Sequence, residues 1–362
     1  MNVAKERSLR LDAEFGDLKS FSGYFLDADA LKRSSSGGAA SAIAKSFIRN
    51  GGVVFGVAYT EDFRRARYVC AETFDDLRWL KGSKYIFADK EVEVDGKCVP
   101  VSTAVAAKLL EGRKVLFVGL ACDVAGVKRY VGSRNISDDN LFTVDLICQG
   151  PTFPNVQSDF IQDLEARYRS QVISFSVRHK RAGWTPPYVL AEFANGKRFC
   201  RPLYETDFGY AFKVFSRKSC FNCAFKGNNH PADVTLGDYW GLQPGMKAFN
   251  RWGVSIMFQH TKKGELLIAQ IDRSTFCVEE ADTLFAIKHN RMFYESKPKS
   301  EYYERFRDDF HKHGLHYAVV HSSGYTNYRR TALRKRILRL IGPGTKRVVK
   351  AIKDRFDMAR NR

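Results

Sequence analysis

Four cysteines are placed in a pattern that constrains how this chain can fold. Cys122 and Cys148 each end an apolar segment, VLFVGLAC and LFTVDLIC, of the kind that forms a buried strand, and a helical pattern follows each segment. If these strands lie side by side and parallel, about 4.8 Å apart, both sulfur atoms project from the same end of the sheet. Cys220 and Cys223 form a Cys-x2-Cys loop in KSCFNCAFKG. Arriving from elsewhere in the chain, this loop would complete the four thiolates that one iron-sulfur cluster requires.

The composition indicates a folded protein, which we expect in the cytoplasm. Of the 362 residues, 44% are hydrophobic and 27% are charged, and these fractions exclude a disordered or fibrous protein. No apolar run reaches the roughly 18 to 20 residues of a membrane span, and the N-terminal residues lack the apolar stretch of a secretory signal. Because cytoplasmic thiols stay reduced, the eight cysteines indicate one clustered site and isolated buried thiols rather than disulfide bonds.

The order of helical and apolar segments predicts an α/β fold. Helices are expected over 39–49 and 101–110, and a strand is expected over 53–59. This alternation in the first half of the chain favours a parallel or mixed sheet flanked by helices. In the second half, short segments alternate polar and apolar residues, and Asn195-Gly196 is typical of a hairpin turn. We therefore expect an antiparallel, α+β module there.

Two loops suit the binding of an anionic group. The first opens the helix over 39–49, where free backbone N–H groups and the helix dipole favour a phosphate. The second offers a lysine charge, a hydroxyl and a phenol in a row. The loops consist of Ser35, Ser36, Gly37 and Gly38, and of Gly82, Ser83, Lys84 and Tyr85. Neither matches the G-x-G-x-x-G or Walker pattern, so a capped helix start without a ligand is an alternative interpretation of the first loop.

Two further segments combine charge with aromatic rings. Arg178, Lys180 and Trp184 follow a predicted strand and suit an anionic or aromatic ligand, although an exposed basic strand end fits the same residues. Asp238 and Trp240 lie where another strand ends, a position that often faces a cleft. No Ser-His-Asp grouping or H-E-x-x-H motif is present, so hydrolysis by those routes is poorly supported.

The spacing of the cysteines alone leaves the metal open. A 4Fe-4S cluster and a structural zinc ion both take four ligands. Zinc ribbons usually present two Cys-x2-Cys pairs, whereas this chain has one such pair and two thiols at strand ends. The residues therefore favour an iron-sulfur cluster, with a zinc site or unligated cysteines as the alternatives.

Six segments, taken in order, resemble the beta subunit family of coenzyme F420 hydrogenases and dehydrogenases. They are SSSGG, LKGSKY, VLFVGLACDVAGVKRY, DLICQG, VRHKRAGW and SCFNCAFKGNNHPADVTLGDYWG, and they span about residues 30–260. The division that follows has an N-terminal arm (1–29), a flavin-binding N-terminal module (30–112), a C-terminal module with the iron-sulfur site and substrate cleft (113–320), and a basic tail (321–362). We expect the arm, which is polar and has no clear period, to be irregular.

The resemblance implies an oxidoreductase that couples hydride transfer at FAD to single-electron transfer through a 4Fe-4S cluster. It implies that Cys122, Cys148, Cys220 and Cys223 are the cluster ligands. The two anion-binding loops would hold the flavin. Lys180 and Trp184 would line the neighbouring catalytic cleft.

The resemblance also suggests substrates and partners. Coenzyme F420 is a candidate substrate, and many relatives come from polysaccharide biosynthesis loci, so a small molecule or glycan precursor is another. Electrons would come from a donor protein or a reduced cofactor. Residues 1–69 contain no cysteine, so at most one cluster is expected. Asp123 and Gln149 replace the family's usual neighbours of the cysteines, which puts the cluster potential and the donor in question.

The C-terminal tail carries most of the excess positive charge. The net charge is +19, and residues 329–362 contain 13 Lys or Arg and two Asp. Apolar residues recur there with helical spacing, which is typical of a basic amphipathic helix on an anionic bilayer. This would place the protein peripherally on the inner face of the membrane. A solvated helix packed on the protein itself is the alternative, and nucleic acid is the less favoured partner.

Two rival functions remain at this point. One is a four-cysteine, zinc-stabilised module that binds nucleic acid or a partner without redox activity. The other is a scaffold that keeps the fold without redox chemistry.

Overall fold

The centre of the molecule is an eight-stranded mixed sheet. The computed structural model describes residues 3–322, so the predicted basic tail at 329–362 lies outside the described residues. The strands of the sheet are β1 (Lys19–Phe25), β2 (Val53–Tyr59), β3 (Ala66–Ala71), β6 (Val115–Leu120), β7 (Leu141–Leu146), β11 (Val234–Asp238), β12 (Ser255–Gln259) and β13 (Phe276–Glu280). They lie in the order β13-β1-β12-β11-β7-β6-β2-β3. The inner strands β11, β7, β6 and β2 are parallel, and the other pairs are antiparallel.

Helices cover both faces of this sheet, because successive side chains of its strands are buried on opposite sides. Val54 and Leu116 pack on one face against α3 (Ala39–Arg49) and α9 (Lys262–Ala269). Phe55 and Phe117 pack on the other face against α5 (Val101–Leu110) and α6 (Ala121–Ser133). Phe258 packs with α1 (Val3–Phe15), α10 (Thr283–His289) and α11 (Arg291–Tyr294). The predicted α/β class, with a mixed sheet flanked by helices, is confirmed.

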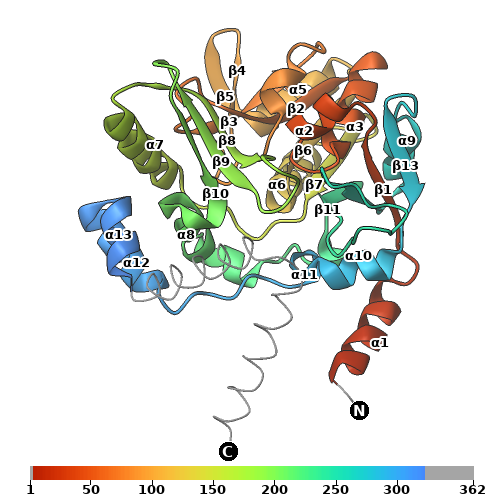
Figure 1. Cartoon of the computed structure of the whole chain (residues 1–362). Coiled ribbons are helices and arrows are strands. Elements are labelled where there is room, and N and C mark those ends of the chain that lie inside the picture. Colours follow the sequence, from red (N-terminus) through yellow and green to blue (C-terminus); the bar gives the residue numbers. More distant parts are fainter. Residues whose placement is uncertain (1–2, 323–362) are drawn as a thin grey trace, which may run out of the picture.

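A second, three-stranded antiparallel sheet stands beside the main one. It contains β8 (Val172–His179), β9 (Tyr188–Phe193) and β10 (Arg198–Pro202), in the order β10-β9-β8. It shares a core with α7 (Pro154–Tyr168), α8 (Asp207–Val214), α12 (Tyr303–His313) and α13 (Leu315–His321), which lie together in Figure 1. The turn predicted at Asn195-Gly196 joins β9 to β10, and Gly196 has a φ of 79°. The predicted antiparallel module is therefore confirmed for this sheet.

The remaining elements are short connections. They are α2 (Ala28–Arg33), α4 (Leu77–Leu80), the hairpin of β4 (Glu91–Val94) and β5 (Lys97–Pro100), and three 3-10 turns (Leu203–Glu205, Lys218–Asn222 and Gly227–Asn229). Among residues 3–322, every helix is too short or too polar to cross a bilayer.

The prediction of an irregular segment before residue 30 is wrong. β1 lies inside the main sheet, paired with both β12 and β13, and α1 packs beneath it. The buried positions of β1 include Ser20 and Ser22, which hide the apolar pattern that normally identifies a strand. The Ser20 hydroxyl is satisfied by the Thr283 hydroxyl, 2.7 Å away. An added Cβ at Gly23 would lie 2.4 Å from the carbonyl oxygen of Cys277, so the close approach of β13 requires glycine there.

Candidate functional site

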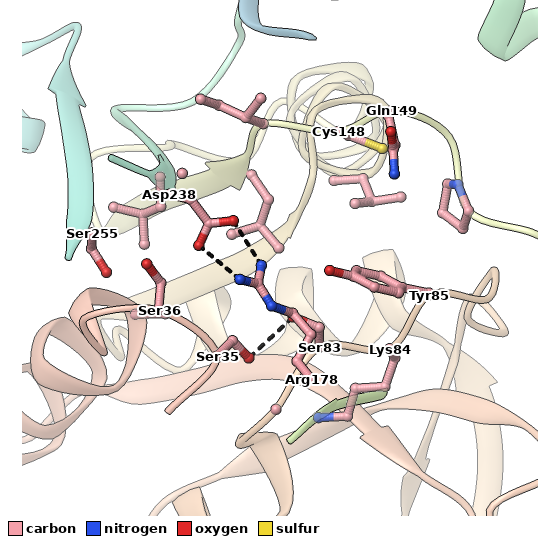
Figure 2. A pocket seen from close by; sticks show the side chains of 18 of the residues that line it. Ser35, Ser36, Ser83, Lys84, Tyr85, Cys148, Gln149, Arg178, Asp238 and Ser255 are labelled. Carbon is pink, nitrogen blue, oxygen red and sulfur yellow. Dashed lines mark hydrogen bonds and ion pairs between the residues drawn. The ribbon is translucent and has the colours of Figure 1, made fainter. Parts of the chain in front are cut away.

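A cavity lies at the carboxyl ends of the parallel strands. Its volume is about 630 Å³, within the usual range for a small-molecule site. The ends of β6, β7 and β11 line it, as expected for ligand sites of open α/β sheets. The segments 34–41 and 80–86 form further parts of its wall (Figure 2).

The first predicted loop lies at the N-terminus of α3, on the cavity wall. Ser35, Ser36 and Gly38 line the cavity, and Gly38 has a φ of 99°. Gly38 supplies no side-chain cap for α3, and although the Ala39 N–H donates to the Ser255 hydroxyl at 3.4 Å, the next N–H groups of the first turn suit an anionic ligand. Gly37 does not line the cavity. An added Cβ there would lie 2.0 Å from the carbonyl oxygen of Gly23, so Gly37 allows the loop to approach β1.

The second predicted loop lies beside the first, and a hydrogen bond joins the two loops. The hydroxyls of Ser83 and Ser35 are 3.0 Å apart. Gly82 has a φ of 84° and open space around its α carbon, and it lines the cavity together with Ser83, Lys84 and Tyr85. The Lys84 ammonium donates to the carbonyl oxygens of Leu80 and Lys81, both at 3.0 Å. Burial lowers the pKa of Lys84 to about 7.

Positively charged side chains lie near the part of the cavity wall that the two loops form. Lys81 lines it, and burial together with repulsion from Lys45 and Arg33 lowers the Lys81 pKa. Positive charge beside the open N-terminus of an 11-residue helix suits a phosphate or diphosphate group. The geometry therefore fits the phosphate part of a dinucleotide such as FAD.

The structure brings Cys122 and Cys148 to the same sheet end, as the spacing predicts. β6 and β7 are parallel neighbours joined by α6. Cys122 lies in the first turn of α6, and Cys148 follows β7 and lines the cavity. The Gly150 N–H donates to the sulfur of Cys148 at 3.2 Å. Gly150 has a φ of 89°, and an added Cβ would lie 2.9 Å from the Cβ of Cys220, so Gly150 allows the Cys-x2-Cys loop to approach.

The four thiols are close enough to affect one another's pKa. Although the Cys122 side chain is exposed to solvent, desolvation by the surrounding protein raises its pKa, and Asp123, Cys148 and Cys220 act in the same direction. Burial likewise raises the pKa of Cys148 to about 11, and the Cys220 and Cys223 thiols add to the shift. A bound metal would reverse these shifts, because metal-ligated thiols lose their protons.

The thiol cluster is not arranged as a finished metal site. Within residues 3–322, no three cysteine, histidine, aspartate or glutamate side chains lie close enough to hold a metal ion. As a donor set, four thiols from three segments suit an iron-sulfur cluster, and Gly150 lies against two of them, Cys148 and Cys220. The assignment of the four cysteines as ligands stays a prediction.

A buried lysine lies beside the thiols. Lys297 donates to the Phe212 carbonyl oxygen at 2.9 Å and to the Ser216 hydroxyl at 3.0 Å, and Ser216 in turn donates to the Gly150 carbonyl oxygen at 3.2 Å. Burial lowers the Lys297 pKa to about 8, and the Cys220 and Cys148 thiols act in the opposite direction. A cation here would stabilise the negative charge that thiolate ligands bring.

Lys180 and Trp184, the predicted cleft residues, lie behind the cavity wall and are not among its lining residues. The Lys180 ammonium is buried and donates to the carbonyl oxygens of Leu31 and Ser36, each at 2.7 Å. Trp184 is buried and stacks on Trp240, with ring centroids 4.5 Å apart. Trp240 itself lines the cavity. Neither side chain lines the cavity, so this placement favours roles in positioning the wall, and a catalytic role for the two residues stays a prediction.

The cavity also contains an ion pair that the sequence did not predict. Arg178, at the end of β8, donates both terminal nitrogens to Asp238, at the end of β11, with distances of 2.7 and 3.2 Å. Both residues line the cavity. The sequence identified Arg178 as part of a basic strand end and Asp238 as an acid at the end of another strand. Nothing in the sequence indicated that they pair.

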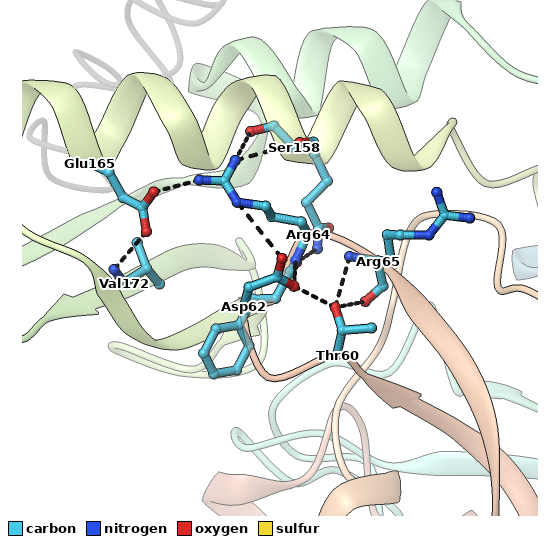
Figure 3. A network of polar contacts seen from close by, with 9 residues as sticks. Thr60, Asp62, Arg64, Arg65, Ser158, Glu165 and Val172 are labelled. Atoms are coloured by element: carbon cyan, nitrogen blue, oxygen red, sulfur yellow. Dashed lines mark hydrogen bonds and ion pairs between the residues drawn. The ribbon is translucent and has the colours of Figure 1, made fainter. Parts of the chain in front are cut away.

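A polar network fixes the small sheet that carries Arg178 (Figure 3). Arg64, in the turn between β2 and β3, donates to Glu165 of α7 at 2.5 Å and to the Ser158 carbonyl oxygen at 3.0 Å. The other Glu165 carboxylate oxygen accepts from the N–H of Val172, the first residue of β8, at 3.0 Å. The start of β8 is thus tied through α7 to the main sheet, which holds Arg178 in place relative to β11.

Comparisons with known proteins agree with this architecture. Two family models match, and they describe the two parts of the beta subunit of coenzyme F420 hydrogenase/dehydrogenase. The model of its N-terminal part matches residues 20–94. The model of its C-terminal part matches residues 112–283. Together the two matches cover more than half of the chain.

Among solved structures, a chain of the xenon-derivatised F420-reducing [NiFe] hydrogenase complex from Methanosarcina barkeri superposes with a TM-score of 0.50. The alignment covers 80% of this chain and 91% of that chain, with 17% sequence identity. At this identity the likeness concerns the fold. No curated protein sequence matches the chain at a significant level.

Proposed function

The chain belongs to the coenzyme F420 hydrogenase/dehydrogenase beta subunit family of iron-sulfur flavoprotein oxidoreductases, and on this premise we propose that it couples hydride transfer at FAD to single-electron transfer through one 4Fe-4S cluster. One observation carries the proposal. A single cavity is lined both by the two loops suited to a dinucleotide and by Cys148 of the thiol cluster. A flavin in this cavity would therefore lie beside the thiols. Family membership argues against the zinc-stabilised binding module.

The residues of the cavity have distinct tasks in this proposal. The Ser35–Gly38 loop and the N-terminus of α3 would bind the FAD phosphates, and Gly82 and Ser83 would close over them. Cys122, Cys148, Cys220 and Cys223 would ligate the cluster. When bound, flavin exchanges two electrons as hydride and releases them singly, and an iron-sulfur cluster carries one electron at a time. The protein would hold the two sites at one edge of the sheet, within reach of each other.

For the reaction partners, we propose a small organic substrate or glycan precursor in a polysaccharide or related biosynthetic pathway. Coenzyme F420 is a second candidate for the hydride partner, and a donor protein or reduced cofactor would exchange electrons with the cluster. Anaerobic mixing with reduced F420 tests one of these directly, because oxidation of the deazaflavin restores its visible absorbance. No absorbance change with F420, together with turnover of a glycan precursor, would favour the biosynthetic role.

We further propose that residues 329–362 hold the protein on anionic membranes. The support is the excess of 13 Lys or Arg over two Asp in this segment. The full chain should sediment together with vesicles of anionic lipids, whereas a chain ending at residue 328 should stay in the supernatant. Equal retention of both chains, or retention on neutral vesicles, would contradict the proposal.

The main test of the proposed function is purification without oxygen, followed by iron, sulfide and flavin analysis. We expect brown protein with four iron atoms, four sulfide ions and one FAD per chain, as one 4Fe-4S cluster and one flavin require. Colourless protein with one zinc ion per chain would overturn the proposal. Protein that contains flavin but no iron would support the flavoprotein assignment and contradict the proposed cluster.

A further inference from the structure

The Arg178–Asp238 pair in the cavity wall combines charge with near-complete burial. The Arg178 side chain is 10% exposed and that of Asp238 is 13% exposed, yet both line the cavity. Figure 2 shows the two side chains pointing toward one another. The backbone on the Asp238 side is fixed, because the Asn290 amide donates to the Asp238 carbonyl oxygen at 3.0 Å.

The pair has hydrogen-bonding capacity left over. A guanidinium carries five N–H donors, and two of those of Arg178 are given to Asp238. Burial lowers the Arg178 pKa, but Asp238 and the neighbouring Tyr85 phenol together outweigh this effect, so the net shift is upward. A carboxylate accepts about four hydrogen bonds, and the Asp238 side chain accepts two from Arg178. Because both side chains line the cavity, their remaining donors and acceptors are within reach of a ligand bound there.

This pairing disfavours an anion at the same place. Asp238 neutralises Arg178 and would repel a phosphate, in contrast to the cationic end of the cavity near Lys81. A neutral group that offers both a donor and an acceptor suits the pair better. The imide edge of a flavin ring, C=O, N–H and C=O in a row, offers that pattern: a carboxylate accepts the N–H and a guanidinium donates to a neighbouring carbonyl.

We propose that Arg178 and Asp238 bind the imide edge of the flavin ring, with Asp238 accepting its N3–H and Arg178 donating to an adjacent carbonyl oxygen. This inference rests on the proposed function, since it requires a flavin in the cavity. It adds a recognition role for two residues. A purely structural ion pair would tie β8 to β11 without distinguishing one flavin from another.

The test compares FAD with FAD methylated at N3, which lacks the imide N–H. The full-length protein, stripped of flavin, is titrated with each compound, and binding is followed by quenching of flavin fluorescence. We expect FAD to bind at least about tenfold more tightly, because the methylated compound leaves the Asp238 carboxylate unpaired. Equal binding of the two compounds would overturn the inference while retaining the flavoprotein assignment. Binding of neither would overturn the proposed function itself.

Two variants sharpen the result. Asp238→Asn keeps the size of the side chain but replaces one acceptor oxygen by a donor, so the preference for FAD should fall to within about threefold. Ser83→Ala, which removes a hydroxyl outside the ion pair, should weaken both compounds equally and keep the preference. Full preference for FAD in a folded Asp238→Asn protein would show that the pair is structural. If that variant does not fold, the comparison of the two compounds on the unchanged protein still decides.

Discussion

The two ends of the cavity differ in the chemical groups that line them and in how those groups are paired. At the serine end, the loops are held by hydrogen bonds: Ser36 donates to the Val254 carbonyl oxygen at 2.9 Å, and Lys180 donates to the carbonyl oxygens of Leu31 and Ser36. At the cysteine end, the backbone is equally fixed, for example by the Cys223 N–H, which donates to the Ser296 hydroxyl at 2.9 Å. The thiols there have raised pKa values and, among the described residues, lack a metal-binding arrangement.

This difference has a physical cause. Hydroxyls, amides and ammonium groups satisfy one another by hydrogen bonds within the protein. Burial favours the neutral form of the thiols, and a thiol that ligates a metal gives up its proton, so metal binding and thiol ionisation are coupled. We therefore expect substitutions at the cysteine end to affect iron content, and substitutions at the serine end to affect flavin affinity and stability.

The largest effect is expected from Cys220→Ser. Loss of one of four ligands should remove the iron and sulfide and the cluster's share of the visible absorbance, and little flavin should be lost. Metal analysis and absorption spectra of anaerobically purified protein measure both quantities. Cys200→Ser is the matched control, since Cys200 lies on β10 in the small sheet and should keep full iron content. Full iron in the Cys220→Ser protein would reject the ligand assignment.

The second comparison uses a pair of glycines, Gly150→Ala and Gly82→Ala. Both residues have positive φ, 89° and 84°, so each substitution should cost about 1 kcal/mol of backbone strain. Only at Gly150 would the new methyl group clash, 2.9 Å from the Cys220 Cβ, and this should add about 1–3 kcal/mol. Urea unfolding measures both. Equal losses of unfolding free energy in the two variants would show that the Cys220 loop shifts to accommodate the new methyl group.

A pH effect is expected from the buried lysines of the serine end. Burial lowers the Lys180 pKa from 10.5 to about 7. Between these values the unfolded chain binds a proton that the folded chain does not, so the unfolding free energy rises with pH. Each such lysine contributes a slope of about 1.4 kcal/mol per pH unit.

Lys180→Met should remove that share of the slope, as measured by urea unfolding at several pH values within this window. Lys84→Met should remove a second share of similar size, because the Lys84 pKa is also about 7. An unchanged slope in either variant would show that the lysine concerned is charged in the folded protein.

The smallest effect is expected from Ser83→Ala. The substitution removes the 3.0 Å hydrogen bond between the two loops and should cost about 0.5–1.5 kcal/mol of stability. Flavin affinity should fall modestly, and iron content should not change. Loss of iron in this variant would contradict the division of the cavity into two independent ends.

Much of the fold and part of the site could be predicted from the sequence. The helices over 39–49 and 101–110 and the strand over 53–59 agree with α3, α5 and β2, because their apolar spacing is regular. The parallel placement of Cys122 and Cys148 followed from two apolar strands joined by one helix. Strand β1 was missed because its buried serines look like those of a loop.

The sequence by itself determined the elements and the chemical groups that the chain can offer, since periodicity and residue type are local properties. Which groups meet was decided only by the tertiary structure. Arg178 and Asp238 are 60 positions apart and form a pair because β8 and β11 end at the same place. Lys180, two residues from Arg178, is instead buried behind the loop of residues 35–38, because its ammonium donates to the carbonyl oxygens of Leu31 and Ser36. A contact between distant segments depends on how sheets and helices pack, and no single segment encodes that packing.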